Sequence, residues 1–205
     1  MKLYNSVGPN PHVVRMFAAE KDVKLDLAQV DLMAGENRKA PYNEAINASG
    51  TLPTLELDDG RKICEITTIC EYLDETQPGP SLIGSTPEER AETRMWTRRI
   101  DLGIVEPMTN GFRASEGRRL FESRMRLLND EGAAGLKAMA SDKLLWLDAQ
   151  MGQNQFVCGD RFTLADVLLF AFLAFGGQVG QSIPDEAGWV KGWFERVKAR
   201  PSAAA

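Results

Sequence analysis

The first 76 residues switch repeatedly between short alternating apolar stretches and stretches with helical spacing. Residues 2–6 (KLYNS) alternate and are interrupted by GPNP, which predicts a strand followed by a turn. From Val13 onward apolar residues recur with helical spacing, and we expect Asn10 to be the N-cap with Pro11 at the first helical position. The chain is therefore predicted to open with a strand and a helix.

The same alternation continues up to residue 75. Residues 25–32 (LDLAQVDL) predict a second strand, and the polar stretch 35–47 predicts a loop with one short helix. Residues 51–65 (TLPTLELDDGRKICE) read as two strands joined at Asp59-Gly60, a strong hairpin signal. A helix over 66–75 completes the order β-α-β-(α)-β-β-α, which is that of a thioredoxin-like domain.

A segment rich in proline, glycine and serine, residues 76–86, separates this part from a purely helical remainder. We predict a domain over 1–77, a linker over 78–86 and an all-α domain over 87–205. Two capping boxes support helix starts, Thr86 with Glu89 and Thr163 with Asp166. The nearly unbroken apolar run 167–175 predicts a buried central helix.

The amino-acid composition excludes several classes of partner and of catalytic site. A net charge of −5 argues against nucleic acid as a partner, and no run of about 18 apolar residues or secretory pattern is present, so we expect a cytoplasmic protein without membrane association. The three cysteines lack CxxC spacing, which indicates packing roles rather than a disulfide or zinc site. With His12 as the single histidine, neither a catalytic triad nor a metal site is expected.

The sequence resembles the glutathione transferase superfamily over nearly its full length. Four motifs carry the resemblance in order: TLPTLELDDG, CEITTICEYLDE, GDRFTLADV and WFERVKARPS. The resemblance implies a thioredoxin-like N-terminal domain that holds glutathione and an all-α helical-bundle domain that holds a second substrate. It also implies a homodimer, with glutathione as cosubstrate and no metal.

The resemblance implies a set of glutathione contacts at the hairpin and the helix after it. Pro53 is expected to be a cis-proline, with the backbone of Leu52 facing the cysteinyl group. Glu65 is expected to accept from the α-amino group, and the N–H of Ile66 to bind the γ-glutamyl carboxylate at a helix N-terminus. Family members carry serine or threonine where this chain has Ile66, so a hydroxyl hydrogen bond worth about 0.5–1.5 kcal/mol is missing here. Thr67 can supply the missing hydroxyl.

Two charged residues receive roles from the resemblance alone. Lys39, with Arg38 as a competitor, falls where many members offer a cation to the glycine carboxylate. Asp101 falls where some members reach the glutathione of the partner subunit. On this polar loop the cation can also be a solvent-facing charge, and the spacing around Asp101 is loosely fixed.

A glutathione transferase must turn a thiol with a pKa of about 8.5 into a thiolate at neutral pH. Lowering this pKa by two units requires that the thiolate be stabilised by about 2.7 kcal/mol relative to the thiol. A helix N-terminus offers about 0.3–1 kcal/mol and a hydrogen bond to a charged group about 1.5–3 kcal/mol, so one neutral donor suffices. Family classes use a tyrosine, serine or cysteine near the first strand. This chain has no cysteine there, and we expect Asn10 first and Tyr4 second as the donor, while Asn10 can also be a pure N-cap.

The expected function is conjugation of glutathione to a small hydrophobic electrophile, as in detoxification. The alternatives are a glutathione-dependent peroxidase or reductase, and a noncatalytic glutathione-binding regulatory protein of the same fold. The expected electrophile pocket is lined by His12, Met95, Arg99, Met108 and Phe112.

Overall fold

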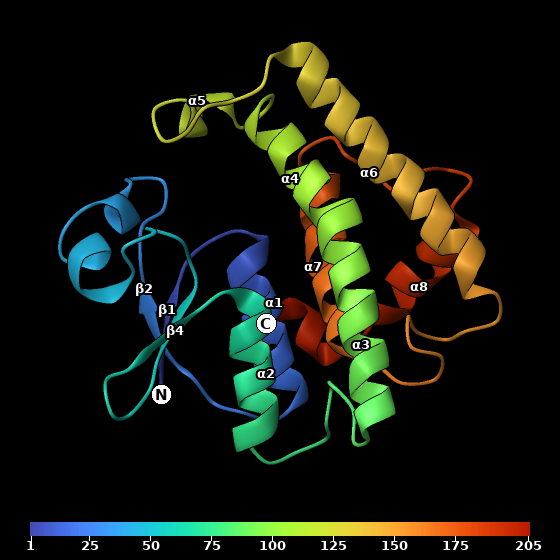
Figure 1. The fold of residues 1–205 in the computed structure, drawn as a ribbon, viewed down its shortest axis with the longest axis horizontal. Coiled ribbons are helices and arrows are strands. Elements are labelled where there is room, and N and C mark those ends of the chain that lie inside the picture. The colour runs from blue at the N-terminus through green and yellow to red at the C-terminus, as the bar shows by residue number, and fades with distance from the viewer. The chain divides into compact units, whose positions relative to one another are not determined.

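The structure, a computed structural model, describes all 205 residues. The chain forms two compact units (Figure 1): unit 1 is Met1–Ile83 together with Pro201–Ala205, and unit 2 is Gly84–Arg200. None of the helices combines the length and the apolar character that crossing a membrane requires.

Unit 1 is a four-stranded sheet with two helices packed against each other. The strands, in the spatial order β2-β1-β3-β4, are β1 (Lys2–Asn5), β2 (Asp26–Gln29), β3 (Thr54–Glu56) and β4 (Lys62–Cys64). Strands β1 and β2 are parallel and the other pairs antiparallel, with Leu3 opposite Leu55. The helices are α1 (Pro9–Glu20) and α2 (Ile66–Thr76). Leu3, Leu55, Phe17 and Ile69 are fully buried and form the centre of this unit.

The hairpin expected at Asp59-Gly60 is confirmed, because β3 and β4 pair on either side of it and Gly60 has a φ of 85°. The polar loop before it differs from the prediction. Instead of one short helix it holds two helical turns, a 3₁₀-helix η1 (Glu36–Arg38) and a π-helix η2 (Tyr42–Ile46).

The start of α1 also differs from the prediction. The helix begins at Pro9, and its N-cap is Gly8, with a φ of 105°. Asn10 is therefore inside the first turn and is not the N-cap. Glycine at position 8 allows this early start because it adopts a positive φ without the steric cost of a side chain.

Unit 2 is helical. Its elements are α3 (Pro87–Ile100), η3 (Asp101–Val105), α4 (Glu106–Arg113), α5 (Arg118–Phe121), α6 (Asp130–Met151), α7 (Leu164–Gln178) and α8 (Gly188–Lys198). The only β pairing is two isolated bridges within residues 156–161. The capping boxes of α3 and α7 are both formed, as the sequence predicts.

The segment η3 is a π-helical turn that joins α3 to α4 without a break. Glu106 donates its N–H to the carbonyl of Asp101, five residues back. Pro107 follows directly and cannot donate an N–H, and a proline ring inside an α-helix collides with the carbonyl four residues back. The widened turn before Pro107 fits this requirement.

The core of unit 2 surrounds α7, which is buried from Leu164 to Leu173. Asp166, fully buried, accepts four hydrogen bonds: from the N–H of Val157, the N–H and Oγ1 of Thr163, and Nε1 of Trp193. One carboxylate thus joins the start of α7 to the preceding loop and to α8.

The stretch predicted to be the linker, residues 78–86, belongs to unit 1 up to Ile83. Leu82 and Ile83 are buried, and the buried ion pair of Lys21 with Asp74, 3.1 Å, also binds this stretch. Lys21 donates to the carbonyl of Pro80, and Asp74 accepts from the N–H of Leu82. Unit 1 therefore extends about six residues beyond the predicted boundary and, unlike the prediction, includes residues 201–205.

Candidate active site

The peptide bond between Leu52 and Pro53 is cis, as the resemblance implies. Leu52 is half-buried and lies two residues before β3, and neither its N–H nor its C=O takes part in a backbone hydrogen bond. This residue therefore offers one donor and one acceptor to an extended peptide.

A buried polar scaffold holds the loop that carries Leu52. The hydroxyl of Tyr42 donates to the carbonyl of Thr51 at 2.7 Å, and Nδ2 of Asn47 donates to the same carbonyl at 3.1 Å. Nδ2 of Asn37 donates to the carbonyl of Gly50 at 2.6 Å. Sequence reasoning missed these residues, and Asn47 alone had a local signal, since its Oδ1 accepts from the N–H two residues later.

Glu65 makes the whole connection between β4 and α2. It is the N-cap of α2 and has a φ of 69°, which costs a non-glycine residue energy and is found preferentially at functional sites. Its carboxylate is exposed and makes no capping hydrogen bond. No acidic residue lies in the first turn of α2, so the N–H groups of Ile66 and Thr67 can face an anion.

The start of α1 has few backbone N–H groups that are free to bind a ligand, and one of them belongs to Asn10. The first four N–H groups of a helix have no partner inside it, and here they would belong to residues 8–11. Pro9 and Pro11 have no N–H, so Gly8 and Asn10 supply the only two. No side chain caps α1 and no acidic residue lies in its first turn, so the half-buried Asn10 amide is not used as a cap.

Arg15, in the second turn of α1, ties the helix to the end of β1. Its Nη1 donates to Oδ1 of Asn5 at 2.6 Å and to the carbonyl of Ser6 at 3.4 Å. The hydroxyl of Ser6 is buried and donates to the carbonyl of Val30 at 2.7 Å. The Ser6 hydroxyl therefore has a structural role, and the hydrogen bonds of this residue hold the loop that leads to Asn10 in place.

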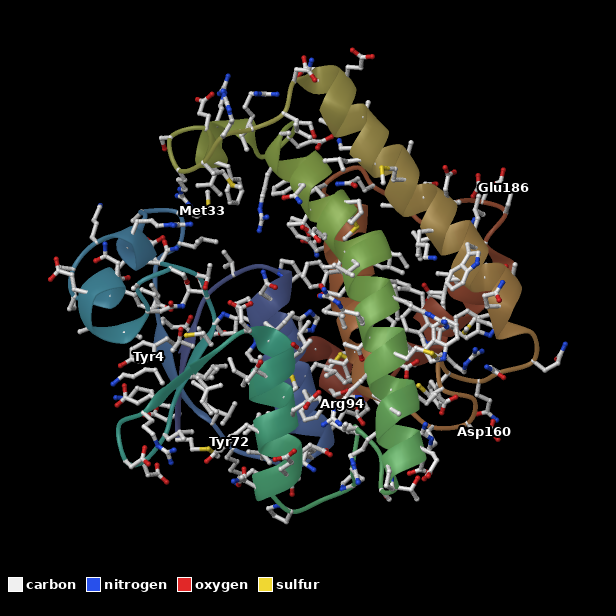
Figure 2. All side chains as sticks on the ribbon, in the orientation of Figure 1. Tyr4, Met33, Tyr72, Arg94, Asp160 and Glu186 are labelled. Atoms are coloured by element: carbon white, nitrogen blue, oxygen red, sulfur yellow. The ribbon has the colours of Figure 1, made fainter.

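Tyr4 (labelled in Figure 2) faces away from the buried Leu3, because side chains alternate along a strand. Its hydroxyl donates to Oε2 of Glu56 at 2.8 Å, and its ring lies edge-on to Tyr42. Burial, with the Glu56 carboxylate, raises the pKa of Tyr4 to about 12. The Tyr4 hydroxyl proton is therefore held by Glu56.

Comparison with known proteins agrees with this site. Residues 7–76 match the model of the glutathione S-transferase N-terminal domain, and residues 137–201 match that of the C-terminal domain. Glutathione S-transferase 2 of Saccharomyces cerevisiae is 34% identical over 206 residues, which cover 98% of this chain and 87% of that protein. The chain belongs to the glutathione S-transferase family. It is an enzyme of that family, and glutathione is its thiol substrate.

Solved structures agree with this membership. A glutathione S-transferase domain-containing protein of Marinobacter aquaeolei VT8 is 35% identical with a TM-score of 0.91, over 99% of this chain and all of that one. Gtt2 of Saccharomyces cerevisiae is 32% identical, also with a TM-score of 0.91, over all of this chain and 99% of that one. The fold predicted for the transferase, a thioredoxin-like domain with a helical domain, is confirmed.

In the transferase Arg38 and Lys39 are exposed and Asp101 is half-buried. Nζ of Lys39 donates to the carbonyl of Ala34 at 3.1 Å, and Nη1 of Arg38 donates to that of Ser49 at 3.1 Å. Asp101 begins η3 and lies 3.8 Å from Arg98, one turn earlier. All three are held by neighbours on their own loop or helix.

The pocket residues expected in unit 2 fall into two pairs. Met95 and Arg99 share the exposed side of α3, where the Arg99 guanidinium lies over the rings of Trp96 and Trp146. On α4, Met108 is buried, with its carbonyl accepting from Gln181. The structure therefore does not bring all four together.

Phe112 lies one turn after Met108 and is half-buried. Its ring meets Phe175 of α7 edge-on at 5.0 Å and Phe121 of α5 at 6.2 Å. These three residues form an aromatic cluster at the ends of α4 and α7. His12, the fifth expected residue, belongs to unit 1, where its Nε2 lies 3.0 Å from the carbonyl of Ala203.

Proposed function

We propose that this transferase conjugates the glutathione thiolate to a small hydrophobic electrophile, with Asn10 as the donor that stabilises the sulfur. The observation that carries the proposal is the start of α1, where two prolines leave the backbone N–H of Asn10 beside its side-chain amide. The helix N-terminus adds about 0.3–1 kcal/mol and a charge-assisted hydrogen bond about 1.5–3 kcal/mol. Together these reach the roughly 2.7 kcal/mol that a two-unit fall in thiol pKa requires.

The rest of glutathione binds along the edge formed by the loop before β3 and the start of α2. In this proposal the backbone of Leu52, next to Pro53, pairs with the cysteinyl residue, and Glu65 accepts from the α-amino group. The N–H groups of Ile66 and Thr67 hold the γ-glutamyl carboxylate, and the Thr67 hydroxyl replaces the one that Ile66 lacks. The exposed carboxylate and the uncapped start of α2 support this assignment.

Lys39 is the proposed partner of the glycine carboxylate. Its ammonium has three N–H donors, and the Ala34 carbonyl uses one. The cation is exposed and therefore reachable. Replacement by methionine should weaken binding of glutathione but leave binding of its γ-glutamylcysteine fragment unchanged.

The electrophile is proposed to contact the aromatic cluster of Phe112, Phe121 and Phe175. Aromatic faces and edges bind apolar and aromatic molecules through burial and ring–ring contacts. Phe112→Ala should raise the KM for chlorodinitrobenzene without changing the KM for glutathione. An equal effect on both KM values would contradict this assignment.

A homodimer is the proposed assembly, with Asp101 near the glutathione of the partner subunit. Sedimentation equilibrium tests the assembly. Asp101→Asn tests the residue, and it should raise the KM for glutathione without dissociating the dimer.

Calorimetric titration with glutathione is the deciding experiment, followed by turnover with chlorodinitrobenzene and with cumene hydroperoxide. Binding followed by faster turnover of the aromatic chloride supports the proposal. Faster turnover of the hydroperoxide would make peroxide reduction the main activity. Binding without turnover would point to a regulatory protein.

A further inference from the structure

Residues 201–205 follow the last helix of unit 2 in sequence but belong to unit 1. Pro201–Ala204 form a short 3₁₀-helix, η4, which packs against α1. Ser202 in its middle is buried. In Figure 1 the end of the chain, marked C, accordingly lies beside α1.

Two adjacent residues of η4 hold the two ends of α1. The carbonyl of Ala203 lies 3.0 Å from Nε2 of His12, in the first turn of α1. Because a carbonyl can only accept, Nε2 is the donor and carries the proton. The hydroxyl of Ser202 donates to Oε1 of Glu20, the last residue of α1.

The start of α1 lacks a capping side chain, whereas its end is closed by backbone hydrogen bonds from the N–H of Asp22 to Ala19 and from the N–H of Val23 to Ala18. Its N-cap is a glycine, its first turn has no acidic residue and its last turn has no basic one. By contrast, α3 and α7 each begin with a complete capping box, as at Thr86 and Thr163. A side chain that capped α1 would occupy the donors that the sulfur is proposed to use.

We infer that residues 201–204 act as a brace on α1 that positions its first turn, and with it Asn10, for the glutathione sulfur. The inference rests on the proposed function for the part that concerns the sulfur. The contacts themselves belong to unit 1 alone. His12 and Ser202 are thus positioning residues and not groups that touch the sulfur.

The test compares the full chain with a variant lacking residues 201–205 and a matched control lacking Ala205 alone. The absorbance of bound glutathione thiolate is followed against pH. The larger deletion should raise the pH midpoint of thiolate formation by at least half a pH unit. The affinity for S-methylglutathione, which has no thiol to ionise, should change less than twofold. The control should match the full chain. A midpoint unchanged by the larger deletion would overturn the brace.

A second pair of variants decides the matter if the deletion prevents folding. His12→Gln keeps an N–H donor near the position of Nε2, and His12→Ala removes it. The alanine variant should raise the thiolate midpoint and the glutamine variant should restore most of the shift. Equal midpoints in both would overturn the role of His12.

Hydrogen exchange measured without glutathione tests the brace independently of the proposed function. The amides of Val13–Phe17 should exchange at least tenfold faster in the deletion variant or in His12→Ala than in the full chain. If the full chain fails to bind glutathione, the proposed function fails while this exchange result still decides whether η4 braces α1. Unchanged exchange would refute the brace even if glutathione binds.

Discussion

The hydroxyl of Tyr4 donates a 2.8 Å hydrogen bond to Oε2 of Glu56, on the strand paired with its own. A phenol has one proton to donate. While Glu56 receives it, this proton is not available to a sulfur anion, which supports the proposal that the donor lies at the start of α1.

Asn10→Ala should therefore raise the pKa of bound glutathione by about 1 to 2 units, the equivalent of one hydrogen bond to a charged group. Turnover should fall more at pH 6.5 than at pH 9, because the thiol is mostly ionised at the higher pH in either protein. A pH series of thiolate absorbance measures the shift. Tyr4→Phe is the matched control, and a larger shift in that variant would reverse the assignment.

Ile66→Ser should strengthen the hold on the γ-glutamyl carboxylate. The new hydroxyl at the first position of α2 adds one hydrogen bond beside that of the Thr67 hydroxyl, worth about 0.5–1.5 kcal/mol, or roughly a two- to twelvefold lower Kd for glutathione. Calorimetric titration measures it. Ile66→Ala, which shortens the side chain without adding a hydroxyl, should give no such gain; if both variants bind equally, the missing hydroxyl is irrelevant.

Thr97→Val should stabilise the protein. The Thr97 hydroxyl on α3 is buried and has no hydrogen-bond partner, so an apolar group of the same shape removes a desolvation cost of about 1 kcal/mol. Urea unfolding measures the change in free energy. Thr93→Val on the same face is the control: its hydroxyl contacts Arg161 and Cys158, so that variant should lose stability.

Asp166 should titrate near pH 6 in the folded protein, because burial raises the pKa of its carboxyl to about 6 in spite of its four donors. In the unfolded chain the value is about 3.9. Between these pH values the folded state holds a proton that the unfolded state has released, so this group favours folding increasingly as the pH falls from about 6 to about 4. Carbon-13 NMR of the carboxyl group measures the midpoint. A midpoint below 4 would show that the donors outweigh burial and would reverse the sign.

Features whose signals lie within a few neighbouring residues can be predicted from the amino-acid sequence alone. The two capping boxes act across three residues, and the hairpin is specified at Asp59-Gly60. The resemblance carried by TLPTLELDDG also led to the cis bond before Pro53. These features depend on local hydrogen bonds and backbone preferences, and so they could be predicted.

Features that depend on distant partners become visible only in the folded chain. Helix α1 starts at Pro9 rather than Pro11, where the chain before it is held through Ser6 by Val30 and Arg15. The partner of Tyr4 is 52 residues away, and η4 meets His12 across 191 residues of chain. No local pattern encodes such contacts, because they arise from the way separate elements pack.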